Sequence, residues 1–277
     1  MKWEAKKISD AVYFAYGDIF KGMTEAIDSH KELVVSNSFL KSIFKTNLYH
    51  RLIVGGEEID EELQEIFDIG SGFHAYVLEH KEFEDRYHVS DTKDATKETV
   101  RISTNDFKFI TSAYKNIEAK YPQTLDNENV ELAIFGEIDG VKVKCKIDKL
   151  NITKDANGNW IHVEISDLKG VYFAPFNLKK SPTGERWKLR NMLSDIGYDL
   201  QAKFYTKLVK LWLESCGIYC EVSFSLLVAS KETYEVQKFL VGEDMLLTGE
   251  SKFNHVWNDV VEFVKHGKSA LNDVEVL

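Results

Sequence analysis

The chain has 277 residues, which is enough for one sizeable folded domain. Its net charge of −10 argues against a nucleic-acid binder that depends on an overall basic surface. Three cysteines are too few for a four-cysteine zinc or iron–sulfur site, and no apolar run approaches the roughly 20 residues that span a bilayer. We therefore expect a cytoplasmic protein without an iron–sulfur cluster and without a membrane partner. We expect one domain over residues 1–277, with a core at about 34–245, an N-terminal extension and a C-terminal helix.

The first half of the chain reads mostly as helices. Residues 57–67 are acidic with a helical pattern, and they lead into a second helical stretch, residues 69–79, which contains His74. Residues 104–120 have the pattern of a further amphipathic helix. His74 stands among apolar residues, where a lone histidine is either a hydrogen-bonded core residue or a metal ligand.

Strands and a hairpin follow. A strand begins at Glu131, whose carboxylate either supports a site or faces solvent. Residues 141–148 alternate apolar and polar side chains, and residues 160–169 have the pattern of a partner strand. Between them, Asn157-Gly158 is a strong signal for a two-residue type I′ turn, which needs positive φ at both residues.

A two-residue turn at that position fixes the pairing of the two strands. Asp148 then lies directly opposite Asp167, and Lys169 points to the same face. Two carboxylates this close repel each other unless a cation lies between them, and Mg²⁺ is suited to such oxygen ligands. Lys169 would orient the attacking water or stabilise charge in a transition state. The alternative is a surface hairpin with scattered charges, and a longer turn or a β-bulge would break the pairing.

The last third of the chain adds a basic segment and a further helix. Five basic residues fall within twelve positions: Lys179, Lys180, Arg186, Lys188 and Arg190. They form either a loop that holds the DNA backbone or a solvated charged loop. Gln201 and Tyr205 are four apart and therefore share one face of a helix. They could hold a phosphate or the active-site lysine, or Tyr205 could simply pack.

A strand at 217–229, an edge strand at 234–241 and an amphipathic helix at 254–265 complete the pattern. The order of the elements suits an α/β fold with a mixed central sheet flanked by helices.

Several of these segments together resemble a known family. Asp148, the hairpin and Asp167-Leu168-Lys169 resemble the signature of the PD-(D/E)xK nuclease superfamily, which implies a restriction-endonuclease-like core. The helix of His74 and residues 198–205, Tyr-Asp-Leu-Gln-Ala-Lys-Phe-Tyr, are similar to motifs of its phage-type RecE (exonuclease VIII) group. Residues 36–40 are similar to a short serine-containing motif of that group. Gly170 departs from the pattern, because a threonine commonly follows the lysine.

The resemblance assigns roles to residues of this chain. It implies that His74, Asp148 and Asp167 are metal ligands, with Glu131 as support. It also implies that the catalytic set is Asp148, Asp167, Lys169, Gln201 and Tyr205.

The resemblance further implies a DNA exonuclease dependent on Mg²⁺, with Mn²⁺ as an alternative. Such an enzyme degrades linear double-stranded DNA from 5′ to 3′ without ATP. It acts on duplex ends as a homo-oligomer and supplies 3′ single strands to a single-strand annealing protein in phage or prophage recombination. Alternatives are a structure-selective or single-strand endonuclease on the same core, or a catalytically inactive DNA-binding module.

Overall fold

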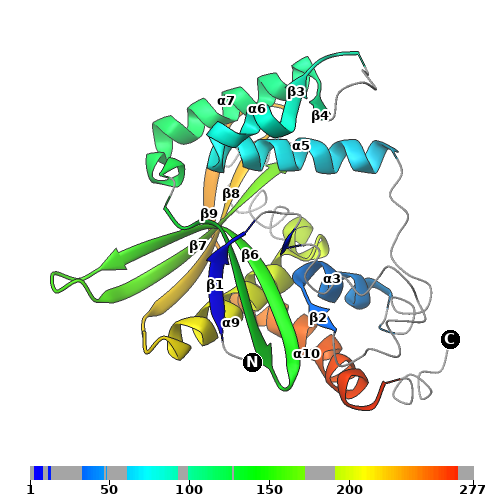
Figure 1. The fold of residues 1–277 in the computed structure, drawn as a ribbon, viewed down its shortest axis with the longest axis vertical. Coiled ribbons are helices and arrows are strands. Elements are labelled where there is room, and N and C mark those ends of the chain that lie inside the picture. The colour runs from blue at the N-terminus through cyan, green and yellow to red at the C-terminus, as the bar shows by residue number, and fades with distance from the viewer. Residues whose placement is uncertain are drawn as a thin grey trace.

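A mixed β-sheet forms the centre of the computed structural model (Figure 1). The structure describes residues 3–8, 12–13, 33–46, 48, 61–92, 99–126, 128–171 and 191–267. In this part of the chain, seven strands follow the order β1-β5-β6-β7-β8-β9, with β2 added beside β6. β2 pairs parallel with β6 and β7 pairs parallel with β8, whereas the other neighbours are antiparallel. The strands are β1 (Glu4–Lys7), β2 (Val34–Val35), β5 (Val130–Ile138), β6 (Val141–Lys154), β7 (Trp160–Val171), β8 (Glu221–Ser230) and β9 (Val236–Leu240).

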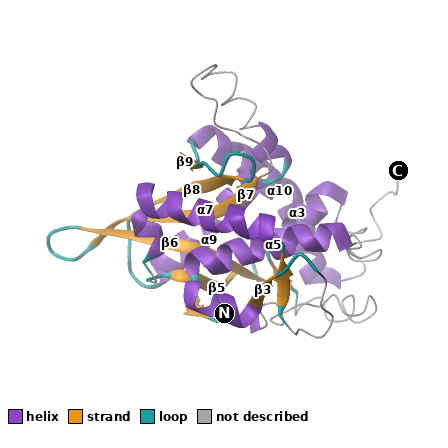
Figure 2. Ribbon diagram, turned by 90° about the horizontal axis from the view of Figure 1, so that it is seen from above, coloured by secondary structure: helices purple, strands orange, loops and turns teal. Residues whose placement is uncertain are grey.

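Helices cover both faces of this sheet, as the sequence pattern predicted (Figures 1 and 2). On one face lie α3 (Asn37–Thr46), α9 (Tyr198–Ser215) and α10 (Glu243–His266). On the other lie α5 (Glu61–Leu78) and α7 (Thr104–Lys120). The expected α/β fold, a mixed central sheet flanked by helices, is therefore confirmed. None of the described helices is long and apolar enough to cross a membrane.

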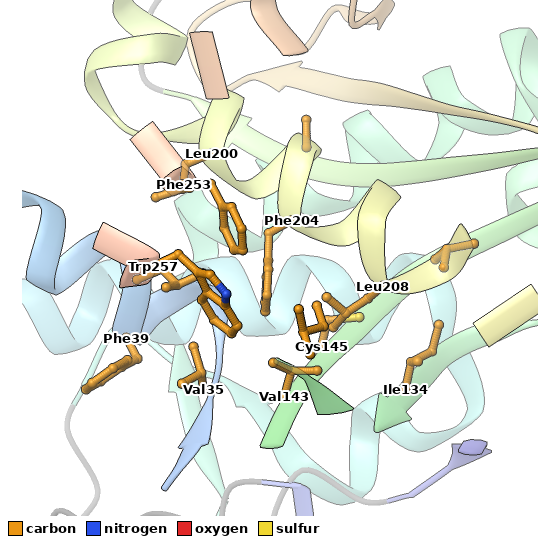
Figure 3. Close-up of a cluster of buried hydrophobic side chains, with 14 of the residues drawn as sticks. Val35, Phe39, Ile134, Val143, Cys145, Leu200, Phe204, Leu208, Phe253 and Trp257 are labelled. Atoms are coloured by element: carbon orange, nitrogen blue, oxygen red, sulfur yellow. The ribbon is translucent and has the colours of Figure 1, made fainter. Parts of the chain in front are cut away.

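The larger core lies between the sheet and the α3, α9 and α10 helices. Phe204 of α9 stacks near Phe253 of α10, and Phe253 stacks on Trp257, with ring centroids 4.8 Å apart in the second pair (Figure 3). Cys145 is buried in the same cluster. Gly249 of α10 is required for this packing, because a Cβ there would lie 2.1 Å from the Asp199 carbonyl oxygen. This close approach fixes α9 firmly against α10.

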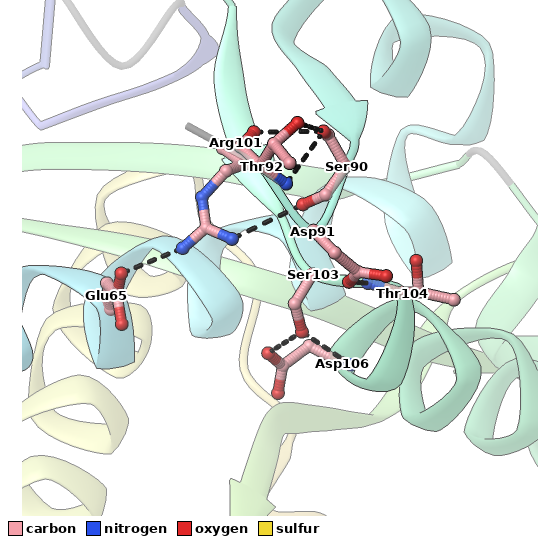
Figure 4. Close-up of polar contacts among 8 residues, drawn as sticks. All are labelled: Glu65, Ser90, Asp91, Thr92, Arg101, Ser103, Thr104 and Asp106. Atoms are coloured by element: carbon pink, nitrogen blue, oxygen red, sulfur yellow. Dashed lines mark hydrogen bonds and ion pairs between the residues drawn. The ribbon is translucent and has the colours of Figure 1, made fainter. Parts of the chain in front are cut away.

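A small second sheet joins α5 to α7. Its strands β3 (Tyr87–Val89) and β4 (Val100–Ile102) are parallel. Arg101 of β4 pairs with Glu65 of α5 at 2.8 Å, and it also donates to the Ser90 carbonyl (Figure 4). Ser103 caps α7 by accepting the backbone N–H of Asp106. These contacts hold α5, the helix of His74, in place above the sheet.

The β6–β7 hairpin has the predicted register but not the predicted turn. Gly158 has φ +84° while Asn157 has no positive φ, so the expected two-residue type I′ turn is wrong. The turn is longer, with Asp155 N–H donating to the Asn159 carbonyl and Gly158 N–H to the Asp155 carbonyl. Lys154 pairs with Trp160 but Thr153 pairs with His162, which leaves Ile161 as an extra, bulged residue. The bulge shifts the register back by one, so that Lys149 pairs with Ser166 as a two-residue turn would require.

The two strands of the hairpin separate just beyond that pair. β6 continues beside β5 and β2, whereas β7 continues beside β8 through Val171. At this fork the Leu168 N–H donates to the Asp148 carboxylate at 2.7 Å. The apolar residues of β6 also change phase here: Cys145 and Ile147 belong to the same core as Leu150. Strict alternation is therefore interrupted at Asp148, the residue of the predicted site.

Candidate active site and metal centre

Three acidic residues lie on three adjacent strands at the fork. The pairs on either side of Asp148, Lys149 with Val130 and Ile147 with Leu132, place Asp148 opposite Glu131. On its other side, the next position beyond the Lys149–Ser166 pair is Asp167. Glu131 has φ +52°, a left-handed backbone conformation that is uncommon outside glycine. It interrupts the ladder between β5 and β6 at the position where its carboxylate faces Asp148.

His74 approaches this row from α5. Its Nε2 lies 2.8 Å from the Leu168 carbonyl oxygen, 94 residues away in the sequence. A carbonyl only accepts hydrogen bonds, so Nε2 carries the proton and Nδ1 of the neutral ring carries a lone pair. That Nδ1 lies 3.5 Å from Asp148 Oδ2. The ligand atoms of His74, Glu131 and Asp148 all lie within 4.8 Å of one another.

The electrostatics of this group match a cation site. Burial, followed by the charge of Lys169, lowers the pKa of His74 and favours the neutral ring. Burial raises the pKa of Asp148, and burial together with Asp148 raises the pKa of Glu131. Three acceptors therefore face one another, and a divalent cation would remove their repulsion. Lys146 forms an ion pair with Glu131 and neutralises part of this charge.

Asp167 lies beside this group but has partners of its own. Its Oδ2 lies 2.5 Å from Lys169 Nζ, and the Gln201 side-chain amide donates to its Oδ1 at 2.7 Å. Burial raises the pKa of Asp167 to about 6, although Lys169 opposes this shift. Ion pairing with Asp167 raises the pKa of Lys169 despite its burial, so Lys169 is a fixed cation. The three mutually close ligand atoms thus belong to His74, Glu131 and Asp148. Asp167, which the resemblance implied to be a metal ligand, is not among them.

The helix α9 supplies Gln201 and Tyr205 from the same face. Gln201 contacts Asp167, which is neither of the partners considered for it, a phosphate or the active-site lysine. The Tyr205 ring is partly buried and packs against the main core, with its centroid 6.3 Å from the Phe224 ring centroid. Burial raises the pKa of its hydroxyl well above the usual value. Gln201 therefore links α9 to Asp167, and the Tyr205 ring helps to seat the helix that carries it.

A buried ion pair that the sequence did not reveal anchors the start of α9. Asp199 is fully buried, and its carboxylate lies 2.8 Å from Lys252 Nζ of α10. Ser194 donates to the same carboxylate at 2.6 Å. The sequence singled out the Tyr-Asp-x-Gln segment that contains Asp199, but it did not indicate the partner, which is 53 residues away.

The remaining predicted residues are placed as follows. The basic residues Lys179, Lys180, Arg186, Lys188 and Arg190 lie outside the described residues. Ser36 accepts the Phe39 N–H and so caps α3. Gly170, the departure from the family pattern, lies where a Cβ would meet the Phe109 ring at 3.3 Å. A larger side chain there would need this ring to shift.

Comparison with known proteins agrees with this geometry. A family described as a PDDEXK-like domain of unknown function (DUF3799) matches residues 36–271. Among solved structures, a candidate exonuclease from Eubacterium rectale is similar with a TM-score of 0.57 and 16% identity. The match covers 98% of this chain and 95% of that one. No curated protein sequence matches. The chain therefore belongs to the PDDEXK-like family DUF3799 and has the fold of the PD-(D/E)xK nuclease superfamily.

Proposed function

We propose that this protein is a metal-dependent deoxyribonuclease that hydrolyses phosphodiester bonds of DNA. One observation carries the proposal: the neutral His74 presents its Nδ1 lone pair to the carboxyl groups of Asp148 and Glu131, within 4.8 Å of both. A hard divalent cation would stabilise such a group of acceptors. Mg²⁺ fits the oxygen-rich set, and Mn²⁺ would fit the same residues.

His74, Glu131 and Asp148 would hold the metal, and Asp167 lies beside them on β7. When bound, the metal supplies charge neutralisation at the phosphate and a lower pKa for water. Lys169 contributes a fixed positive charge where negative charge develops on the phosphate oxygens. Asp167 keeps Lys169 charged and in place, and Gln201 holds Asp167 from the other side. Hydrolysis therefore depends on a chain of contacts from α9 to the reacting phosphate.

The preferred activity is that of a RecE-like exonuclease. The motifs around His74, Asp148 to Lys169 and Gln201 support this choice, as does the similarity in fold to a candidate exonuclease. On this proposal the enzyme degrades one strand of linear duplex from the 5′ end without ATP and works as a homo-oligomer. It would leave 3′ single strands for an annealing protein in recombination.

Digestion of matched DNA substrates tests the proposal. The purified protein with Mg²⁺ is incubated with linear duplex labelled at the 5′ or the 3′ end of one strand, and with a covalently closed circle. We expect early release of the 5′ label, later release of the 3′ label and an intact circle. Cleavage of the circle would instead indicate an endonuclease on the same core. A protein that neither binds a divalent metal nor degrades any of these substrates would be the inactive DNA-binding module.

Asp148→Asn supplies the matched inactive control. Asparagine keeps the size of the side chain and an oxygen that accepts the Leu168 N–H, while it removes one anionic ligand. Activity that survives this change would place the chemistry elsewhere.

A further inference from the structure

Lys41 of α3 is a cation at the site that the chemistry above does not use. Its Nζ lies 5.2 Å from the centroid of the Tyr198 ring, and Lys169 Nζ lies 5.1 Å from the same centroid. Two ammonium groups therefore share one aromatic ring at the start of α9. Burial, followed by the charges of Lys169 and Lys45, lowers the pKa of Lys41 to about 8.

The acidic groups nearby are already engaged by other lysines. Asp167 pairs with Lys169, and Asp199 pairs with Lys252. Within the described part of the chain, Lys41 forms no ion pair or hydrogen bond with a side-chain acceptor. A half-buried cation with a like charge nearby and no anion of its own is destabilised. Contact with the Tyr198 ring offsets part of this destabilisation.

The stem of Lys41 is held in place. A Cβ at Gly197 would meet the Lys41 side chain at 3.2–3.5 Å, and Gly197 itself has φ +85°. Glycine at this position leaves room for the lysine stem to run along the backbone toward the Tyr198 ring. A positioned stem reduces the rotamer entropy lost when the ammonium binds a ligand.

We propose that Lys41 binds a phosphate of the DNA strand next to the phosphate on which Lys169 acts. The substrate then supplies the anion that Lys41 lacks within the described part of the chain. This inference rests on the proposed nuclease function and deepens it, because it assigns a substrate-binding residue on α3. It also links α3, which Ser36 caps at its start, to the positioning of the DNA strand.

Lys41→Met tests the proposal, because methionine keeps an unbranched stem beside Gly197 and removes the charge. Lys45→Met is the matched control, since Lys45 lies one turn further along the same helix and is exposed. Lys41→Arg restores the charge. Binding of a labelled duplex end is measured by fluorescence anisotropy at several salt concentrations, with Ca²⁺ in place of Mg²⁺ to prevent turnover.

We expect the slope of log K against log salt, which is negative, to become less steep by about 0.9 in Lys41→Met, as for the loss of one phosphate contact. The slope should be unchanged in Lys45→Met and restored in Lys41→Arg. With Mg²⁺, KM should rise about tenfold or more in Lys41→Met while kcat changes much less. If Lys41→Met fails to fold by thermal denaturation, Lys41→Gln takes its place.

Two different failures can be told apart. If wild-type protein degrades DNA but Lys41→Met and Lys45→Met have the same slope and KM as wild type, the role of Lys41 is refuted and the nuclease function stands. If wild-type protein neither binds nor degrades DNA, the proposed function itself fails.

Discussion

Replacing Asp148 with asparagine should stabilise the metal-free protein and abolish its response to metal. Burial holds the pKa of Asp148 above its usual value, so ionisation of this carboxyl at pH 8 lowers the stability of the folded state. Asparagine removes that charge, still accepts the Leu168 N–H, and brings an N–H₂ donor into a group of acceptors. The variant therefore loses a repulsion without losing the contact that joins β6 to β7.

The expected size follows from the distances. Two unit charges 4.8 Å apart, the largest separation in the His74–Glu131–Asp148 group, repel by about 3 kcal/mol at an effective dielectric of about 20. Lys146 and Lys169 offset part of this repulsion. A net gain of about 1–2 kcal/mol remains, which for a protein of this size raises Tm by about 2–6 °C.

The assay is thermal unfolding at pH 8, in EDTA and then across increasing Mg²⁺. Wild-type Tm should rise with Mg²⁺, because a ligand that binds only the folded state stabilises it, and Asp148→Asn should stay flat. Glu164→Gln is the control variant, for which we expect the opposite change in stability. Burial alone would raise the pKa of Glu164, but hydrogen bonds from Lys238 and Ser225 lower it overall, so its removal should destabilise. The reasoning is refuted if Asp148→Asn is less stable than wild type in EDTA, or if Mg²⁺ raises both Tm values equally.

Further predictions concern the contacts around the same site. Lys169→Met should lower kcat by about 10²–10³ and keep the Mg²⁺-dependent rise in Tm; loss of that rise would make Lys169 part of the metal site. Gln201→Met should lower kcat by about tenfold or more, since Asp167 loses a hydrogen bond, whereas an unchanged kcat would remove Gln201 from the chain of contacts. Lys252→Met should destabilise the protein by about 3–5 kcal/mol in urea unfolding, because Asp199 is left buried without its cation; a loss under 1 kcal/mol would contradict this. Metal-free stability should fall between about pH 4 and 6 and level off above, because the pKa of Asp167 is about 6 when folded against 3.8 when unfolded, and urea midpoints that rise over this interval would disagree.

The register that brings Asp167 to the position next to Asp148 was predictable from the sequence, although the observed hairpin reaches it through two departures that cancel each other. The turn has one residue more than the Asn-Gly rule indicated, and the bulge at Ile161 restores the register. Either change alone would have moved Asp167 to the other face of β7. Alternation of side chains predicts strands well because burial is periodic, whereas a single bulge leaves no periodic trace in the sequence.

Contacts between distant segments could not be obtained in this way. His74 meets Leu168 across 94 residues, and only the resemblance to a nuclease motif indicated that the two belong to one site. The left-handed backbone of Glu131 has no local signal, because such conformations usually call for glycine or asparagine. The Asp199–Lys252 pair depends on the approach of α10 to α9, which Gly249 permits. These features are set by tertiary packing and not by local propensity.

The fork in the sheet explains why the candidate site lies where the metal-free fold is least favourable. A continuous ladder at this point would pair every backbone group with another backbone group. Here the Asp148 carboxylate accepts the Leu168 N–H, the Leu168 carbonyl is bound by His74, and Glu131 leaves the ladder altogether. The same groups that open the sheet are therefore those of the candidate metal site. Because these departures raise the free energy of the metal-free fold, we expect metal binding to be coupled to folding, and a variant that repairs the fork should gain stability as it loses function.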